Sequence, residues 1–155
     1  MAALRALERP ARAGLRWAPP EQWHVTLRFY ASVDPDGLVD ALNAAQPRLP
    51  SATATAGPQP ALLGDRIWMV PIGGLETLAD RVAAATSHLA PPEGPRPFSG
   101  HLTLARARHP ADLRDLSTRP LGVEWTVREV VAFQSHLTSS GARHDPLGRW
   151  PLSSE

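Results

Sequence analysis

The sequence predicts an α+β domain in which mainly antiparallel sheets carry helices on their outside. Runs with the two-residue alternation of strands are interspersed with runs whose apolar residues recur at helical spacing. Their order is strand, helix, two strands, helix, and then further strands. The length fits such a fold, because 155 residues, of which 43% are hydrophobic, make one ordinary globular domain or two small lobes that share a core.

In the first half of the chain, the strongest strand signal is the run at residues 23–30, which alternates strictly and is rich in β-branched and aromatic residues. A helix is predicted after Asp34, because an aspartate followed by proline is typical of an N-cap and a first helical turn. We also expect a short helix at residues 1–9. An extended segment is expected at residues 53–63, with a break at Gly57.

In the second half, a strand is predicted at residues 66–72. The glycine pair Gly73 and Gly74 then turns the chain into a second helix. The remaining predicted elements are, in order, a turn-rich loop at 90–97, a strand at 101–106, one helical turn at 112–116, two extended runs at 121–128 and 130–137, and a short one at 150–152.

The composition excludes several kinds of protein. With 16 basic and 15 acidic residues, the chain is neither a polybasic arm nor an acidic tail. Cysteine is absent, which removes thiol catalysis, disulfide frameworks and cysteine-ligated zinc. No apolar run approaches the ~18 residues of a membrane span. Arginines also interrupt the first residues, where a signal peptide would be apolar. We therefore expect a cytoplasmic monomer with no membrane partner.

A four-residue pattern occurs twice, as His24-Val25-Thr26-Leu27 and as His101-Leu102-Thr103-Leu104. The composition predicts only about 0.05 copies of His-x-Thr-Leu by chance, so two copies are a strong signal. Residues i and i+2 of a strand point to the same face. Each copy therefore presents an imidazole beside a hydroxyl and turns its aliphatic residues to the other face. We expect the two strands to line one cleft from opposite sides.

Two imidazoles and two hydroxyls suit acid–base chemistry at a phosphate. A neutral histidine can take a proton from an attacking water while a protonated one gives a proton to the leaving oxygen. The hydroxyls can donate to non-bridging oxygens. A cyclic phosphodiester is the natural substrate, because its ring already holds the leaving oxygen. No HExxH-like spacing or carboxylate cluster accompanies His24 or His101, so we expect neither a metal nor a cofactor.

The arginines near the signatures have two interpretations each. Arg28 shares the predicted face of His24 and Thr26, so it either reaches a phosphate or forms a cross-strand ion pair. The arginines after the second signature form either an electropositive rim for an RNA backbone or a solvated segment offset by nearby aspartates. These arginines are Arg106, Arg108, Arg114 and Arg119.

On these residues, the sequence resembles the two-histidine phosphoesterases and, within them, the bacterial and archaeal RNA 2′,3′-cyclic phosphodiesterases, also called 2′-5′ RNA ligases. The two signatures carry the resemblance, and the arginine five residues after His101 extends the second one. Supporting similarity lies in the approach to the first signature, in a mid-chain strand and in the closing strands, at residues 15–23, 65–68, 130–137 and 150–152.

The resemblance implies that residues 1–155 form a single two-lobed domain, with two antiparallel sheets flanking a central cleft, helices outside and one signature in each lobe. It implies hydrolysis of RNA or nucleotide 2′,3′-cyclic phosphate ends to 2′-phosphomonoesters, with reversible 2′-5′ RNA ligation as a side activity. If the family's roles are transferred to this sequence, His24 would be the general acid that protonates the 3′ oxygen and His101 the general base for water. The opposite assignment of the two roles stays open.

The residues implied to bind the substrate phosphate are Thr26, Thr103 and Arg106. Simple alternation places Arg106 on the opposite face from His101. Its role therefore requires the strand to end or to bulge there.

This sequence departs from the family at its start. The family usually opens with a strand of the type Arg-Leu-Phe-Val-Ala-Ile, and residues 1–9 resemble the middle of the helix that follows it. We therefore expect either that the start of the sequence was assigned too late or that the usual first strand has been lost, and its loss would expose a sheet edge. Two alternatives stay open beside hydrolysis at RNA ends. One is a non-catalytic RNA- or nucleotide-binding protein with a degenerate cleft, and the other is a phosphodiesterase for a small cyclic-phosphate metabolite.

Overall fold

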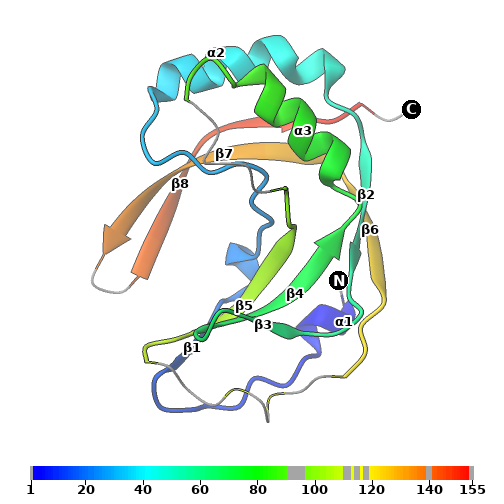
Figure 1. The fold of residues 1–155 in the computed structure, drawn as a ribbon, viewed down its shortest axis with the longest axis vertical. Helices are drawn as coiled ribbons and strands as arrows, with labels where there is room; N and C mark the ends of the chain where they lie inside the picture. The colour runs from blue at the N-terminus through cyan, green and yellow to red at the C-terminus, as the bar shows by residue number, and fades with distance from the viewer. Residues whose placement is uncertain are drawn as a thin grey trace. The chain divides into compact units, whose positions relative to one another are not determined.

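The computed structural model describes residues 2–90, 97–109, 113, 116, 119–138 and 141–153, and the chain divides into two compact units (Figure 1). Unit 1 comprises Met1–Thr26, Thr53–Glu76 and Ser99–Trp125. Unit 2 comprises Leu27–Ala52, Thr77–Phe98 and Thr126–Glu155. Each unit is thus assembled from three separate stretches of chain, and each contains antiparallel strand pairs.

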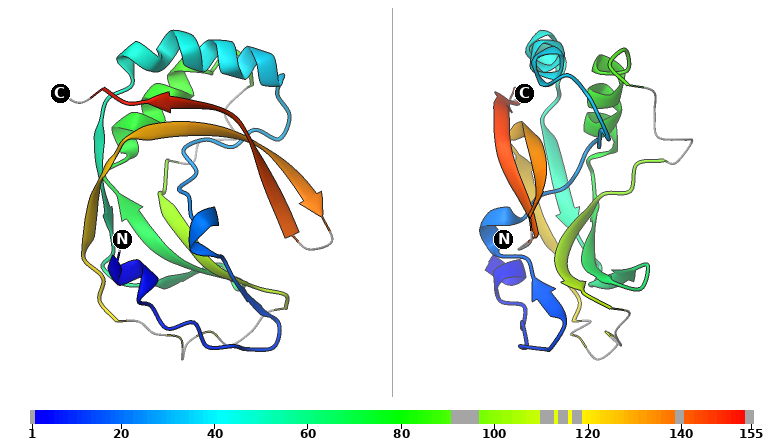
Figure 2. Two further views of the ribbon diagram at one scale, coloured as in Figure 1. Left: turned by 180° about the vertical axis from the view of Figure 1, so that it is seen from behind. Right: turned by 90° about the vertical axis from the view of Figure 1, so that its left-hand side faces the viewer.

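Unit 1 is built on a sheet with the strand order β1-β5-β4-β2-β6, in which β3 also pairs with β4. Its strands are β1 (Leu15–Trp17), β2 (Ala52–Ala56), β3 (Ala61–Leu63), β4 (Ile67–Gly73), β5 (His101–Ala107) and β6 (Val123–Val127). A short α-helix, α1 (Ala2–Arg5), comes before β1, and a 3-10 helix, η1 (Pro20–Gln22), follows it. Figures 1 and 2 show β4 and β5 side by side, paired in antiparallel fashion.

The burial pattern along β4 gives this sheet one apolar face. Trp68, Val70 and Ile72 are buried, and the residues between them are half-buried. The turn predicted at the glycine pair follows directly. Gly74 has a φ of 83°, and a Cβ there would stand 2.1 Å from the carbonyl oxygen of Thr53. Only glycine fits this position, because it has neither the left-handed penalty nor the clashing atom.

Unit 2 contains a two-stranded antiparallel ribbon, β7 (Glu129–Thr138) and β8 (Gly141–Pro151), and two helices, α2 (Pro35–Ala45) and α3 (Glu76–Ala85). A 3-10 helix, η2 (Gln46–Arg48), follows α2. Asp34 begins α2 as predicted, since its carboxylate accepts a hydrogen bond from the backbone N–H of Gly37 at 2.8 Å. Figure 1 shows one end of the ribbon extending beyond the helices.

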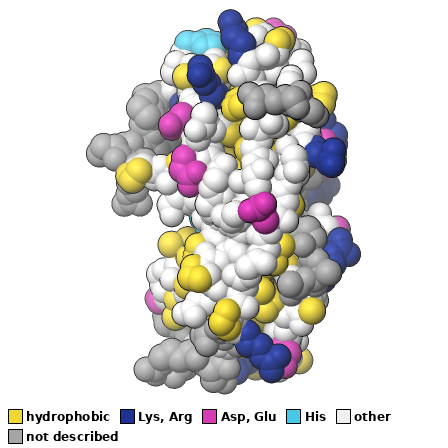
Figure 3. All heavy atoms as spheres, turned by 90° about the vertical axis from the view of Figure 1, so that its right-hand side faces the viewer, with side chains coloured by type: hydrophobic (Ala, Val, Ile, Leu, Met, Phe, Trp, Pro, Cys, Tyr) yellow, Lys and Arg dark blue, Asp and Glu magenta, His cyan; other side chains and the backbone are white. Residues whose placement is uncertain are grey.

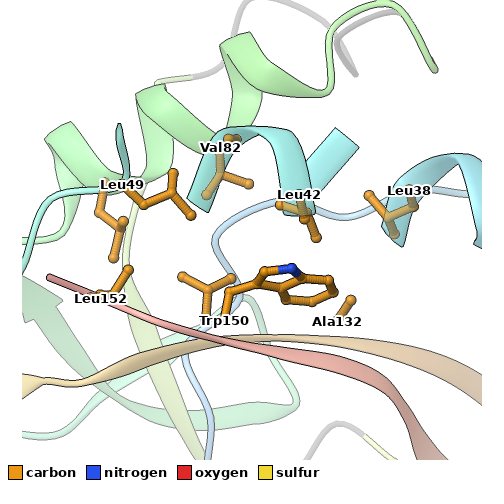
Figure 4. Close-up of a cluster of buried hydrophobic side chains, with 10 residues drawn as sticks. Leu38, Leu42, Leu49, Val82, Ala132, Trp150 and Leu152 are labelled. Atoms are coloured by element: carbon orange, nitrogen blue, oxygen red, sulfur yellow. The ribbon is translucent and has the colours of Figure 1, made fainter. Parts of the chain in front are cut away.

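The core of unit 2 lies between the ribbon and the two helices (Figure 4). Trp150 is 4% exposed, and its indole N–H donates to the side-chain oxygen of Asn43 at 2.8 Å. The ring also covers Gly148, where a Cβ would stand 2.6 Å from the indole. The other buried members come from both helices, the turn after α2 and both strands: Leu38, Leu42, Ala45, Leu49, Leu78, Val82, Val130, Ala132 and Leu152.

The predicted α+β class, with antiparallel sheets and helices packed against them, is confirmed. The helices predicted after Asp34 and after Gly74 are present as α2 and α3, and the short run predicted at 150–152 is the end of the longer β8. The loop predicted at 90–97 and the helical turn predicted at 112–116 lie largely outside the described residues.

The strand predicted at residues 23–30 is wrong. Val25 alone makes an isolated bridge, with Leu102 of β5, and the chain passes into unit 2 after Thr26. The alternation of side chains along 23–30 therefore does not reflect one continuous strand. Its second half has different partners, because the side chains of Arg28 and Tyr30 bond to residues at the end of α3.

The outer surface agrees with the balanced composition. On the face drawn in Figure 3, arginine and carboxylate side chains are interspersed, as expected from 16 basic and 15 acidic residues in the sequence. Among the described residues, no helix is both long enough and apolar enough to span a bilayer.

Candidate active site

The second His-x-Thr signature lies in the sheet of unit 1, and the first is joined to it at one residue. The second occupies the start of β5, and the first lies along the edge of β5 through the antiparallel bridge between Val25 and Leu102. His24 and His101 both belong to unit 1, whereas Leu27, the last residue of the first signature, belongs to unit 2. The expectation of one signature in each lobe stays a prediction.

The bridge fixes which signature residues face each other. Continued by one residue on each side, the antiparallel register sets His24 opposite Thr103 and Thr26 opposite His101. Directly opposed side chains have Cβ atoms about 5 Å apart, and diagonal neighbours are about 7–8 Å apart. In such a register the two imidazoles would lie on one diagonal of a four-residue group and the two hydroxyls on the other. On this face His24 and Thr26 are exposed, and the two residues of the second signature are half-buried.

Each imidazole is held by the same local hydrogen bond. Nδ1 of His24 lies 2.8 Å from the carbonyl oxygen of Gln22, and Nδ1 of His101 lies 3.1 Å from that of Ser99. A carbonyl oxygen only accepts, so Nδ1 carries the proton in both rings. Proton exchange with a substrate then falls to Nε2 in both. The two signatures therefore repeat in ring orientation as well as in sequence.

A β-bulge brings Arg106 to the face of the histidines. On β4, Pro71 pairs with His101, Met69 with Thr103, and Ile67 with Arg106. Since Pro71, Met69 and Ile67 alternate along one face of β4, their partners on β5 share that face too. The extra residue in β5 is Leu104, which the register passes over opposite the step from Trp68 to Met69. The bulge required by the sequence analysis is present, and Arg106 is exposed.

A second arginine, Arg16 on β1, lies directly opposite Arg106 and is also exposed. Sequence reasoning gave it no role. Arg16 lies on the same face of the sheet as Arg106 because of the register of β1 against β5, and no motif in the sequence encodes that register. Within the described ranges, no group of three histidine, aspartate or glutamate side chains comes together that could hold a metal ion.

Arg28 takes neither of its two predicted roles. Its guanidinium donates to the carbonyl oxygens of Ala83 at 2.7 Å and Ala90 at 2.8 Å, and to the hydroxyl of Thr86 at 3.1 Å. It also lies 4.9 Å above the ring of Tyr30, whose hydroxyl bonds to the same threonine. Thr86 is fully buried and in turn donates to a carbonyl oxygen of α3. Arg28 therefore caps the end of α3 inside unit 2.

We expect Arg28→Ala to lower the free energy of unfolding by about 2 kcal/mol, because charged hydrogen bonds to otherwise unpaired carbonyl oxygens are lost. Urea titration followed by circular dichroism measures this. Arg28→Lys is the control and should recover only part of the loss, since an ammonium group does not reproduce the planar fork of a guanidinium. An unchanged unfolding curve for Arg28→Ala would contradict the capping role.

Comparison with known proteins identifies one matching family model. The model of a family described as LigT like Phosphoesterase matches residues 2–55, a segment that contains the first signature. No relative matches among curated proteins.

Solved structures resemble the chain over nearly its whole length. A protein of Thermus thermophilus is 24% identical with a TM-score of 0.77, and the match covers 90% of this chain and 83% of that one. A structure described as a phosphoesterase is 26% identical with a TM-score of 0.72, over 99% of this chain and 89% of that one. Escherichia coli LigT, in its complex with NADP+, is 27% identical with a TM-score of 0.67, over 99% and 88%.

The fold and the repeated signatures are similar to those of the two-histidine phosphoesterases. Within that class the similarity is to the LigT-like phosphoesterases, and the resemblance to the 2′-5′ RNA ligase family is thereby confirmed. These findings support phosphoesterase activity of the two-histidine type.

Proposed function

We propose that this protein hydrolyses 2′,3′-cyclic phosphate ends of RNA or nucleotides to 2′-phosphomonoesters, without a metal ion or cofactor. The observation that carries the proposal is the antiparallel bridge of Val25 with Leu102. From that register, His24 and His101 are diagonal neighbours on one sheet face, each with Nδ1 engaged by a backbone carbonyl. Two such imidazoles can flank one phosphorus centre and divide the roles of acid and base.

In the proposed step, neutral His101 accepts a proton at Nε2 from a water molecule, and the water oxygen forms a bond to phosphorus. The bond between phosphorus and the 3′ oxygen breaks on the opposite side. Protonated His24 gives its Nε2 proton to that oxygen, so a free 3′-hydroxyl and a 2′-phosphomonoester result. The two histidines exchange protonation states, and solvent restores them. With an RNA 5′-hydroxyl in place of water as the nucleophile, the same groups would form a 2′-5′ phosphodiester and a free 3′-hydroxyl, and the reverse of that step would cleave the linkage.

The remaining site residues bind the phosphate in this proposal. Thr26 and Thr103 lie on the second diagonal, where their hydroxyls can donate to the two non-bridging oxygens as negative charge increases on them. Arg106 adds a charge-assisted contact from the same face of the sheet.

The ligands of related structures support a nucleotide substrate. Escherichia coli LigT has been crystallised with 3′-AMP, with ATP, with NADP+ and with phosphate. All four ligands contain phosphate, and three are nucleotides. A fold that accommodates such ligands suits the phosphate chemistry of the paired signatures here. The cytoplasmic location and the monomeric state stay predictions.

The proposal is tested by incubating the protein with adenosine 2′,3′-cyclic phosphate and with a cyclic-ended RNA trinucleotide, both in excess chelator. We expect turnover at an undiminished rate and a single product, the 2′-phosphomonoester, identified against authentic 2′- and 3′-phosphates by phosphorus NMR. Formation of the 3′-phosphate would overturn the leaving-group assignment.

The two alternatives predict different results. Saturable, salt-sensitive RNA binding without product would indicate a binding protein. Rapid turnover of a small cyclic-phosphate metabolite, with neither RNA end hydrolysed, would indicate a metabolite phosphodiesterase.

A further inference from the structure

The first signature begins at the end of a loop on the edge of β5. Ala18 donates its backbone N–H to the carbonyl oxygen of Leu104 at 2.8 Å, and Val25 forms an isolated bridge with Leu102. The two leucines are next but one to each other in β5, whereas Ala18 and Val25 enclose residues 19–24, which contain η1. Residues 19–24 therefore form a loop, and its last residue is the first signature histidine.

The two signature histidines differ in how their carbonyl partners are fixed. Nδ1 of His101 faces the carbonyl oxygen of Ser99, and the carbonyl of the next residue, Gly100, accepts a backbone hydrogen bond from β4 at 2.8 Å. The partner of His101 is thus adjacent to the strand ladder. The partner of His24 is the carbonyl oxygen of Gln22, within η1. The orientation of the His24 ring therefore depends on what fixes the loop.

Trp23 closes this loop. Its indole N–H donates to the carbonyl oxygen of Ala18 at 3.1 Å, so the side chain joins the two ends of the loop. Its backbone N–H donates to the carbonyl oxygen of Pro20 at 3.2 Å. The guanidinium of Arg9 lies 5.0 Å from the centre of the indole, and both side chains are half-buried, which favours a cation–π interaction. These contacts hold the segment that carries the Gln22 carbonyl.

We propose that Trp23 is a positioning residue for His24. By fixing the loop, it keeps the Gln22 carbonyl oxygen against Nδ1, so that the proton stays on Nδ1 and Nε2 faces the substrate. The effect on catalysis rests on the proposed function, whereas the effect on the imidazole does not. Since the indole acts through the His24 ring, its loss should slow the chemical step more than it weakens substrate binding.

The kinetic test uses Trp23→Phe, which keeps an aromatic ring and removes the indole N–H. With a cyclic-ended RNA trinucleotide, we expect kcat to fall at least about tenfold and KM to change less than about twofold, because misplacing a reacting group slows the reaction itself. Arg9→Gln, which keeps the indole, should lower kcat about twofold to fivefold. Trp125→Phe makes the same change at another half-buried tryptophan of unit 1, on β6, and should change neither constant.

The orientation of the ring is measured without substrate. A long-range proton–nitrogen NMR spectrum of the neutral imidazoles reports which ring nitrogen carries the proton, and the His24 signals are those absent from His24→Ala. We expect His24 and His101 to carry it on Nδ1 in the wild type. In Trp23→Phe, the proton of His24 should distribute over both nitrogens, and that of His101 should stay on Nδ1. Arg9→Gln should show the same change to a smaller extent.

An unchanged His24 signal in Trp23→Phe, or a change of equal size at His101, would overturn the inference. A fall of kcat in Trp23→Phe no larger than that in Trp125→Phe would overturn the catalytic part while leaving the proposed hydrolysis intact. If the wild type hydrolyses no cyclic phosphate, the proposed function fails, and the NMR comparison alone decides whether Trp23 orients His24.

Discussion

Replacing His101 by alanine is expected to lower kcat for cyclic phosphate hydrolysis by about 10²–10⁴-fold, the range that a positioned general base contributes. His24→Ala is expected to have an effect of similar size through loss of the general acid. Both rings are held by the same bond from Nδ1 to a backbone carbonyl two residues earlier, so each supplies Nε2 from a fixed orientation. Single-turnover rates on a cyclic-ended trinucleotide measure the chemical step directly.

Three further results should accompany this loss. The wild type should show a bell-shaped dependence of kcat/KM on pH, and each single variant should lose one limb of it. The double variant should be little slower than the slower single variant, because groups that act as a unit are not additive. His109→Ala removes an exposed imidazole that follows the end of β5, and it should leave the rate unchanged. Full activity in either His24→Ala or His101→Ala would refute the acid–base pair.

Trp150→Ala should produce the largest loss of stability, about 3–5 kcal/mol of unfolding free energy, as is typical for removal of a large buried aromatic side chain. The indole is almost fully buried between the ribbon and the helices of unit 2, and it bonds to Asn43 of α2. Truncation would leave a cavity in this core and would leave the Asn43 side chain without its indole donor. Urea denaturation followed by far-ultraviolet circular dichroism measures the change.

Trp150→Phe separates the two contributions. It keeps an aromatic ring and removes the N–H, so we expect it to recover more than half of the stability lost in Trp150→Ala. Equal loss in the two variants would mean that the hydrogen bond to Asn43, and not the buried ring, dominates.

The parts of the fold that could be predicted were those with a local physical signal. Asp34 followed by proline marks the start of α2, and the glycine at position 74 marks the turn before α3. The run at residues 23–30 failed for a long-range reason. Its first half joins the edge of β5, and its second half is held by Arg28 at the end of α3. Alternation of residue types is the same in either case, so the sequence alone does not reveal the change of partner.

For the candidate site, the sequence supplied the two histidines and the two threonines through their repeated spacing, and their catalytic roles stay predictions. It could not supply the register between the two signatures, because any of several pairings would satisfy the alternation. Arg16 was missed for that reason, since it acquires a place on this face only through its pairing with Arg106.

Because of the bulge at Leu104, the number of residues between Thr103 and Arg106 determines which face of the sheet the Arg106 side chain occupies. Side-chain orientation in a strand repeats every two residues, so the three-residue interval from Thr103 to Arg106 reaches the same side only because one residue is absorbed. Without the bulge, the same three-residue interval would turn the guanidinium of Arg106 toward the side where Trp68 is buried. The first signature has Phe29 at the equivalent interval, in unit 2. The duplication of the motif therefore stops at the leucine, and in the proposed site the two histidines have matching surroundings whereas Arg106 has no counterpart at the equivalent position of the first signature.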